Sequence, residues 1–146
     1  MYDCLFESAW KTLEQFASDP KWLDARSGAT MVLHTWGQNL SLHPHVHCIV
    51  PGGGLAADGT WQNSRGGGTK FLYPVLAMSK VFRAIFLQEL CKYLEQGYLV
   101  LPKGEAVLWN YTTWKRDLYK KAWVVYAKRP FGGPKQVIEY LGRYTH

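Results

Sequence analysis

The sequence predicts a mixed fold, either α+β or α/β, formed by a single domain over residues 1–146. Segments with helical periodicity alternate with segments rich in β-branched and aromatic residues. The length suits one domain, and no repeat, low-complexity tract or obvious linker divides it. A hydrophobic content of 47% is enough to bury a core and too high for a disordered chain.

Helices are predicted where apolar residues recur at three- and four-residue spacing. Asp19-Pro20 stops the first helix, and Gly97 stops the longest. Pro134 suits the first position of the last helix. The predicted helices cover residues 2–18, 77–96, 111–121 and 136–146.

Strands are predicted where β-branched and aromatic residues concentrate between turn residues. Residues 30–38 and 45–50 are expected to be antiparallel neighbours, because a short polar gap containing Pro44 separates them. Asp58-Gly59 marks a tight turn after the second of these strands. The remaining predicted strands are a short return strand beginning at 60–61, then residues 69–73 and 123–127.

Composition narrows the class of protein. No segment is long and apolar enough to cross a membrane, and no signal-peptide pattern begins the chain, so a cytosolic location is expected. Three scattered cysteines indicate neither a disulfide framework nor a cysteine-type zinc site. Residues 1–63 carry a net charge of −3 and residues 64–146 one of +9. The basic, aromatic-rich half suits a polyanion such as nucleic acid, although a solvated basic face remains the alternative.

The segment His45-Val46-His47 presents two imidazoles on one side of a predicted strand. Two neutral imidazoles at that separation can share a divalent metal ion. Gln38, on the preceding strand, is the candidate third ligand for Mg²⁺ or Mn²⁺, and its alternative role is a hydrogen bond in the turn. His34 is expected to be a core or supporting histidine.

Tyr140 and Tyr144 lie four residues apart on the last predicted helix, so both phenols share one face, as does Gln136. Such a pair usually only packs, but here it follows a Gly-Gly-Pro turn and accompanies the histidine pair. A phenol beside a metal could attack a phosphodiester, which would leave a 5′-phosphotyrosine and a free 3′-OH. A second tyrosine would hold a second such link, as strand transfer requires.

These motifs resemble the HUH endonucleases, and in particular the two-tyrosine rolling-circle transposases of bacterial insertion sequences. The resemblance is carried by the segments 33–40, 43–54, 123–128, 130–134 and 140–146. It implies an α+β fold with a central antiparallel β-sheet flanked by helices, a palm-type arrangement. The chain would then be one nuclease catalytic domain of a bacterial cytoplasmic transposase, with its tyrosine helix truncated at the C-terminus.

The resemblance also implies roles for individual residues. His45 and His47 would be metal ligands, with Gln38 as the third ligand and Gln136 as its competitor. Tyr140 and Tyr144 would be the nucleophiles, and Mg²⁺ or Mn²⁺ the cofactor. The partner would be single-stranded DNA, at transposon ends and at the target, and the basic residues expected to contact it near the site are Lys128, Lys135 and Arg143.

Two other functions remain open at this point. One is a non-catalytic module that binds single-stranded nucleic acid through the same basic surface. The other is a metallohydrolase in which His43, His45 and His47 hold a zinc-bound water. The second is disfavoured because Pro44 distorts the strand at His43 and no carboxylate follows as a nearby base. His43 could otherwise orient substrate or face solvent.

Overall fold

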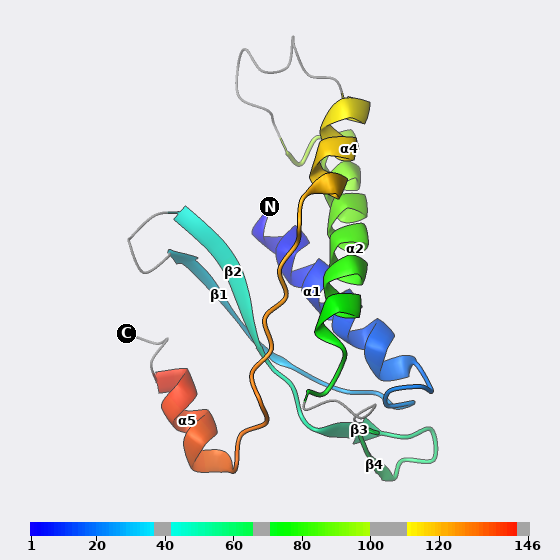
Figure 1. The fold of residues 1–146 in the computed structure, drawn as a ribbon, viewed down its shortest axis with the longest axis vertical. Helices are drawn as coiled ribbons and strands as arrows, with labels where there is room; N and C mark the ends of the chain where they lie inside the picture. Colours follow the sequence, from blue (N-terminus) through cyan, green and yellow to red (C-terminus); the bar gives the residue numbers. More distant parts are fainter. Residues whose placement is uncertain (37–41, 66–70, 100–110, 143–146) are drawn as a thin grey trace.

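The structure is a computed structural model, and it describes residues 1–36, 42–65, 71–99 and 111–142. Figure 1 shows long helices beside a twisted ribbon of strands, with a small hairpin and a short terminal helix at one end. The elements in chain order are α1 (Tyr2–Ser18), β1 (Thr30–Trp36), β2 (Leu42–Ile49), β3 (Gly53–Leu55), β4 (Trp61–Asn63), α2 (Val75–Glu95), α4 (Tyr111–Lys120) and α5 (Pro134–Gly142).

The hydrophobic core lies where α1 meets the sheet and the start of α2. Leu23 is completely buried there, and the Phe16 ring packs on Tyr73 with their centroids 5.6 Å apart. Cys48 of β2 and Val50, which directly follows β2, pack against this core. Since successive side chains of a strand point to opposite faces, the residues next to Cys48 face away from α1.

β1 and β2 form an antiparallel pair in which His34 lies opposite His45 and Val32 lies opposite His47. The register shifts between His34 and Trp36, opposite the part of β2 that contains Pro44. A proline cannot donate to the ladder, so a bulge is where a strand accommodates one. The expected antiparallel neighbours are therefore confirmed, and β2 begins before Pro44 rather than after it.

β3 and β4 form a second, smaller antiparallel hairpin. Its turn is closed by Asp58, whose carboxylate accepts hydrogen bonds from the Thr60 amide and hydroxyl at 2.9 and 2.7 Å. Gly59 supplies the positive φ of 82° that the turn requires. A single bridge between Arg26 and Leu55 joins this hairpin to the segment that leads into β1.

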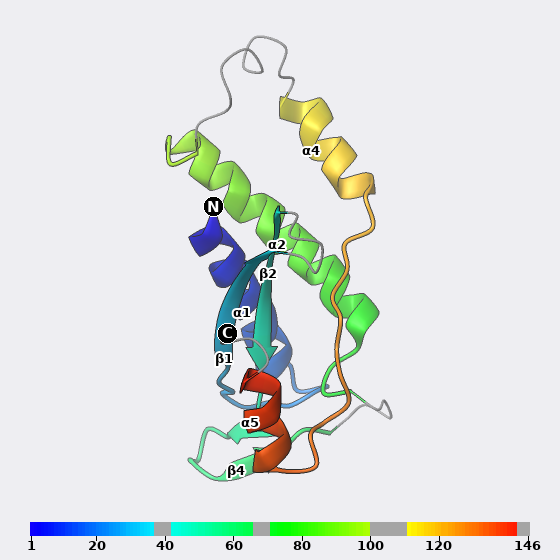
Figure 2. The ribbon, with the colours of Figure 1, turned by 90° about the vertical axis from the view of Figure 1, so that its left-hand side faces the viewer.

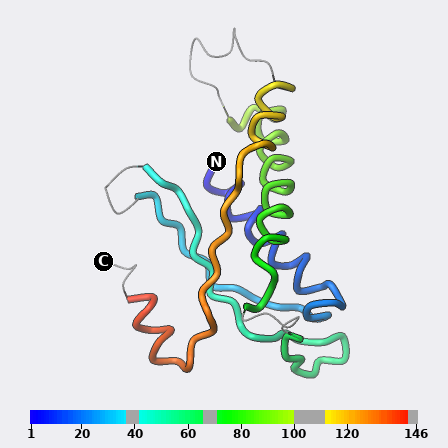
Figure 3. The backbone as a smooth tube through the Cα atoms, viewed as in Figure 1, coloured from blue at the N-terminus to red at the C-terminus, as the bar shows by residue number. Residues whose placement is uncertain are grey.

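The α+β class is confirmed, and the predicted helices appear as α1, α2, α4 and α5. The strand prediction for residues 123–127 is wrong. Figure 3 shows this part of the chain running extended from α4 to α5, and it belongs to neither sheet. Trp123 packs on α2 instead, with its ring 5.3 Å from that of Phe86 and 6.0 Å from that of Phe82, while Val124 and Tyr126 are largely exposed.

The strand predicted at 69–73 is not observed either: residues 71–73 are bends, and 69–70 lie outside the described residues. Over the part of the chain that the structure describes, the strands form two separate two-stranded sheets rather than one central sheet. Among the helices of that part, none combines the length and apolar character needed to span a membrane.

Glu89 on α2 is an almost buried carboxylate, 6% exposed, that ties α1 to α2. Its Oε1 lies 2.9 Å from Lys92 Nζ and 3.1 Å from Lys11 Nζ of α1. The hydrogen bond from Lys92, followed by the contacts of Lys11, lowers the pKa of Glu89 although burial opposes the shift. We expect Glu89→Gln to reduce the free energy of unfolding by about 1–3 kcal/mol at pH 7, because two half-exposed ammonium groups lose their charged partner.

Because the folded-state pKa of Glu89 lies below its ordinary value of 4.5, this stabilisation is complete above that value. It is lost as the pH falls through the folded-state pKa. Urea unfolding at pH 7 and at pH 3 measures the change, and the difference between wild type and Glu89→Gln should shrink at the lower pH. Glu14→Gln, at an exposed position of α1, is the control. A difference that is equal at both pH values contradicts the assignment.

Candidate metal and tyrosine site

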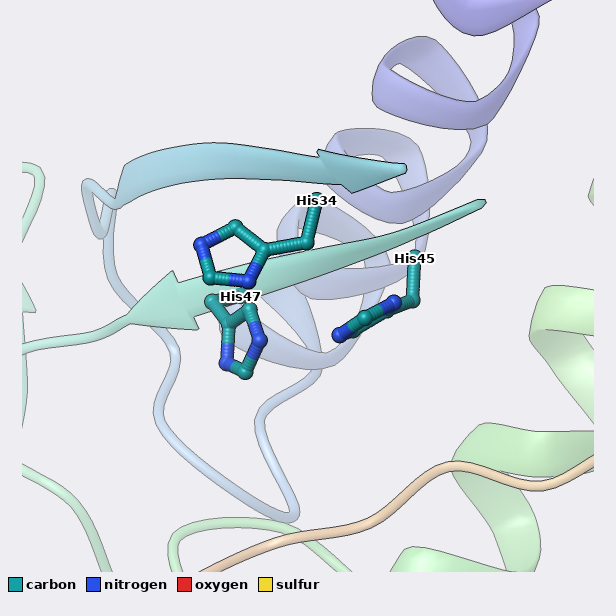
Figure 4. A group of neighbouring side chains, drawn as sticks. All are labelled: His34, His45 and His47. Atoms are coloured by element: carbon teal, nitrogen blue, oxygen red, sulfur yellow. The ribbon is translucent and has the colours of Figure 1, made fainter. Parts of the chain in front are cut away.

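Three imidazoles gather on the face of the β1–β2 ribbon that points away from the core (Figure 4). His34 comes from β1, and His45 and His47 come from β2. Their ring centroids are 4.4 to 5.4 Å apart. One ring nitrogen from each histidine lies within 4.8 Å of the others, so the three can act as one ligand set.

The sequence pattern correctly placed His45 and His47 on one face, but it missed His34 as a member of the group. The strand register explains why His34 belongs to the group, because His34 is directly opposite His45 and diagonal to His47. A signal did exist: residues that oppose each other across an antiparallel pair share a face. Using it requires the exact register, which the bulge near Pro44 shifts.

The tautomer of His45 is set by its own strand. Its Nδ1 lies 2.7 Å from the main-chain oxygen of His43. A carbonyl oxygen can only accept, so Nδ1 donates and Nε2 keeps its lone pair. Metal-ligating histidines are commonly oriented in this way. The exposed side chain of His43 is not one of the three grouped ligands, which differs from the His43-His45-His47 set of the hydrolase alternative.

The surroundings of His47 favour its neutral form. Burial lowers its pKa below the ordinary value of 6.5, and the nearby His34, His45 and Lys128 lower it further. A neutral imidazole is the form that coordinates a metal ion. The environment of His47 therefore favours ligation at neutral pH.

The three histidines fit a divalent metal. Nitrogen–metal bonds of about 2.0–2.2 Å place two tetrahedral ligands of one ion about 3.3–3.6 Å apart. The observed limit of 4.8 Å therefore requires a closure of at most about 1.5 Å, which side-chain rotations can supply. Imidazole donors suit zinc-like ions better than Mg²⁺, which prefers oxygen.

Tyr140 of α5 reaches this cluster. Its hydroxyl lies 2.9 Å from Nδ1 of His47, which is 93 positions earlier in the chain. The Phe131 ring packs against the Tyr140 ring at 5.3 Å, and Lys128 Nζ lies 4.9 Å from the ring centroid. The segment before α5 thus contributes two of the contacts that hold the phenol over the histidines.

The other predicted site residues lie at different places in the chain's structure, and some lie outside the described residues. The Gln136 side-chain oxygen accepts a hydrogen bond from the Gly132 amide at 2.7 Å, so that oxygen caps the turn before α5. Lys135 is exposed in the first turn of α5, and Lys128 lies beside Tyr140. Gln38, Arg143 and Tyr144 lie outside the described residues, and their predicted roles remain predictions.

Comparison with known proteins identifies the family of the chain. Residues 28–146 match the family model Y2_Tnp, described as "Putative transposase". The chain belongs to this transposase family. Over its full length the transposase chain is 45% identical to "Putative transposase y4qJ" of Sinorhizobium fredii. Over 82% of its length it is 26% identical to "Transposase for insertion sequence element IS801" of Pseudomonas savastanoi pv. phaseolicola.

The transposase chain spans 37% of the first of these relatives and 28% of the second. No solved structure is detectably similar to it. The resemblance to transposases that the motifs indicated is therefore confirmed at the level of the family.

Proposed function

We propose that this transposase chain nicks and joins single-stranded DNA through a covalent 5′-phosphotyrosine intermediate, with a divalent metal held by histidines. The observation that carries the proposal is the hydrogen bond between Tyr140 and His47. It joins a candidate nucleophile to a candidate metal ligand within one site. A structural role for Tyr140 alone does not require its hydroxyl to contact a member of a three-histidine group.

In this mechanism the Tyr140 oxygen attacks phosphorus in line with the bond to the 3′ oxygen. The new bond joins tyrosine to the 5′ phosphate, and the P–O3′ bond breaks. The phenol proton leaves to water and the departing 3′ oxygen takes one up, so the step is a transesterification. A divalent ion would polarise the scissile phosphate and stabilise the charge that develops on it.

The residues of the chain have defined tasks in this step. His34, His45 and His47 would hold the ion through ring nitrogens. With Nε2 of His47 used in this way, its Nδ1 carries the proton and donates to the Tyr140 oxygen, which favours the phenolate. Phe131 and Lys128 would keep the ring in place. Tyr144 would form the second covalent link that strand transfer requires.

Single-stranded DNA is the proposed partner because a nucleophile on a helix must reach an accessible phosphate. The charge of the chain supports a polyanion, since residues 64–146 carry a net +9. Lys128 and Lys135 lie on or just before α5 and are exposed, so both could contact the backbone of the strand. With Arg143 they form the proposed DNA-contacting set.

The test is incubation of the chain with a labelled single-stranded oligonucleotide carrying a transposon end, with Mn²⁺ or with EDTA. We expect a protein–DNA adduct that survives SDS and appears only with the metal. An interaction that SDS removes completely would instead identify a non-catalytic binding module.

A hydrolytic zinc site is the second candidate, because three histidines are also the donor set of some catalytic zinc centres. This function would use a metal-bound water and leave no link to tyrosine. Digestion of the reaction product followed by mass spectrometry separates the two candidates, since only the first yields a phosphotyrosyl peptide containing Tyr140.

A further inference from the structure

A cavity of about 370 Å³ lies between the segment that leads into β1 and the β3–β4 hairpin. The side chains that matter there are Trp61, Arg26 and Ser27, and its floor is the backbone of Gly53 and Gly54. We propose that this cavity binds one unpaired nucleotide of the DNA strand, with the base stacked on Trp61 and the phosphate near Arg26. The proposal rests on the proposed function for its choice of ligand.

Trp61 is a preformed stacking platform. It is 56% exposed, although large aromatic rings are usually buried. The indole nitrogen donates to Asn63 Oδ1 at 2.9 Å, which holds the ring in one orientation. The ring also lies against Gly53, where an added Cβ would come within 2.8 Å of it. An exposed ring that is already immobilised loses little side-chain entropy when a base stacks on it.

The cavity floor is rigid and open. Arg26 and Leu55 exchange two main-chain hydrogen bonds of 2.8 and 2.9 Å, and Ser27 Oγ donates to the Gly53 oxygen at 3.3 Å. Gly54 allows the close approach, because a Cβ there would lie 2.5 Å from the Arg26 oxygen. The volume is near the lower end of the range of about 300–1,000 Å³ that small-molecule sites occupy. A single nucleotide is a ligand of that class.

The chemistry of the lining selects a nucleotide. Every base has a flat aromatic face that stacks on tryptophan, and the Arg26 guanidinium is suited to phosphate. Among the described residues that line the cavity, none carries a carboxylate that would repel the phosphate. The ligand therefore carries both an aromatic face and a negative charge, as one nucleotide of a strand does.

The cavity is close enough to the histidine–tyrosine site for one strand to reach both. The chain passes directly from His47 on β2 to Gly53 on β3, and about six residues span at most about 20 Å. Figure 2, like Figure 1, places α5 and the β3–β4 hairpin at the same end of the long axis. At the stacked-strand spacing of about 3.4 Å per nucleotide, a span of about 20 Å corresponds to about six nucleotides, so we expect the bound base within that distance of the cleaved phosphate.

The experiment measures binding of the chain to labelled oligonucleotides in which one position at a time is abasic. With wild type, one position within about six nucleotides of the cleavage site should weaken binding about 5- to 100-fold. Trp61→Leu, which keeps apolar bulk against Gly53, should weaken binding of the intact strand by a similar factor and abolish the penalty at that position. Trp61→Tyr should preserve both.

Tyr98→Leu is the matched control, because Tyr98 is also an exposed aromatic residue and lies beyond the end of α2. It should leave affinity and the abasic pattern unchanged. Arg26→Gln should weaken binding and reduce the slope of log affinity against log salt by about one. Circular dichroism checks that each variant is folded. If Trp61→Leu does not fold, Arg26→Gln serves as the test.

A wild-type affinity that no abasic position changes overturns the inference, and so does an abasic pattern that persists in Trp61→Leu. Failure of the proposed function has a different signature. The wild-type chain would then form no covalent adduct, whereas the Trp61-dependent abasic penalty would still be present.

Discussion

Replacing Tyr140 by phenylalanine is expected to reduce covalent adduct formation on single-stranded DNA on the order of 10³-fold, since the variant lacks the attacking oxygen. The substitution keeps the ring that packs against Phe131 and removes only the hydroxyl that contacts His47. The loss should therefore be chemical rather than structural. The measurement is the initial rate of SDS-stable adduct formation with Mn²⁺, together with the melting temperature of each variant.

Tyr98→Phe is the control for this substitution, because it removes a hydroxyl from an exposed tyrosine distant in sequence from both motifs. It should react like wild type. Tyr144→Phe should affect strand transfer more than the first cleavage, and Tyr140→Phe combined with Tyr144→Phe should leave only background. An undiminished adduct in this double variant would remove both tyrosines from the mechanism.

Removing the metal ligands is the second large effect. His45→Ala combined with His47→Ala is expected to abolish cleavage and to weaken Mn²⁺ binding on the order of 10²-fold or more. Even residues that only support metal ligands contribute about 10- to 100-fold to affinity. Isothermal titration with Mn²⁺ measures the affinity, and the adduct assay measures the reaction.

His43→Ala is the matched control on the same strand. It removes an imidazole but leaves the main-chain oxygen that orients His45. We expect metal affinity close to that of wild type. A loss as large as that of the double variant would favour the hydrolase arrangement with His43 as a ligand.

The same titration identifies the third ligand. His34→Ala should weaken Mn²⁺ binding strongly, because His34 lies within the three-histidine group. Gln136→Ala should have a small effect, because the side-chain oxygen of Gln136 already caps the turn at Gly132. The reverse result would assign the ligand to Gln136. Equal, small effects of both substitutions would point to Gln38.

Local patterns predicted the elements that short-range spacing or a stop signal marks. The apolar face of α1 locates that helix, because the face must meet the core, and Gly97 marks the end of α2. The β1–β2 pair follows from two β-rich segments separated by a short turn. The strand prediction for residues 123–127 failed because Trp123 finds its partners on α2, a long-range contact that no local pattern reveals.

The sequence by itself determined that His45 and His47 share a strand face, because alternation along a strand is a local property. It also placed Tyr140 on a helix and established the transposase family. Only the tertiary structure decided that His34 completes the histidine group and that Tyr140 contacts His47. These contacts depend on strand register and on how the extended chain after α4 returns α5 to the sheet, and both are set by packing between residues distant in sequence.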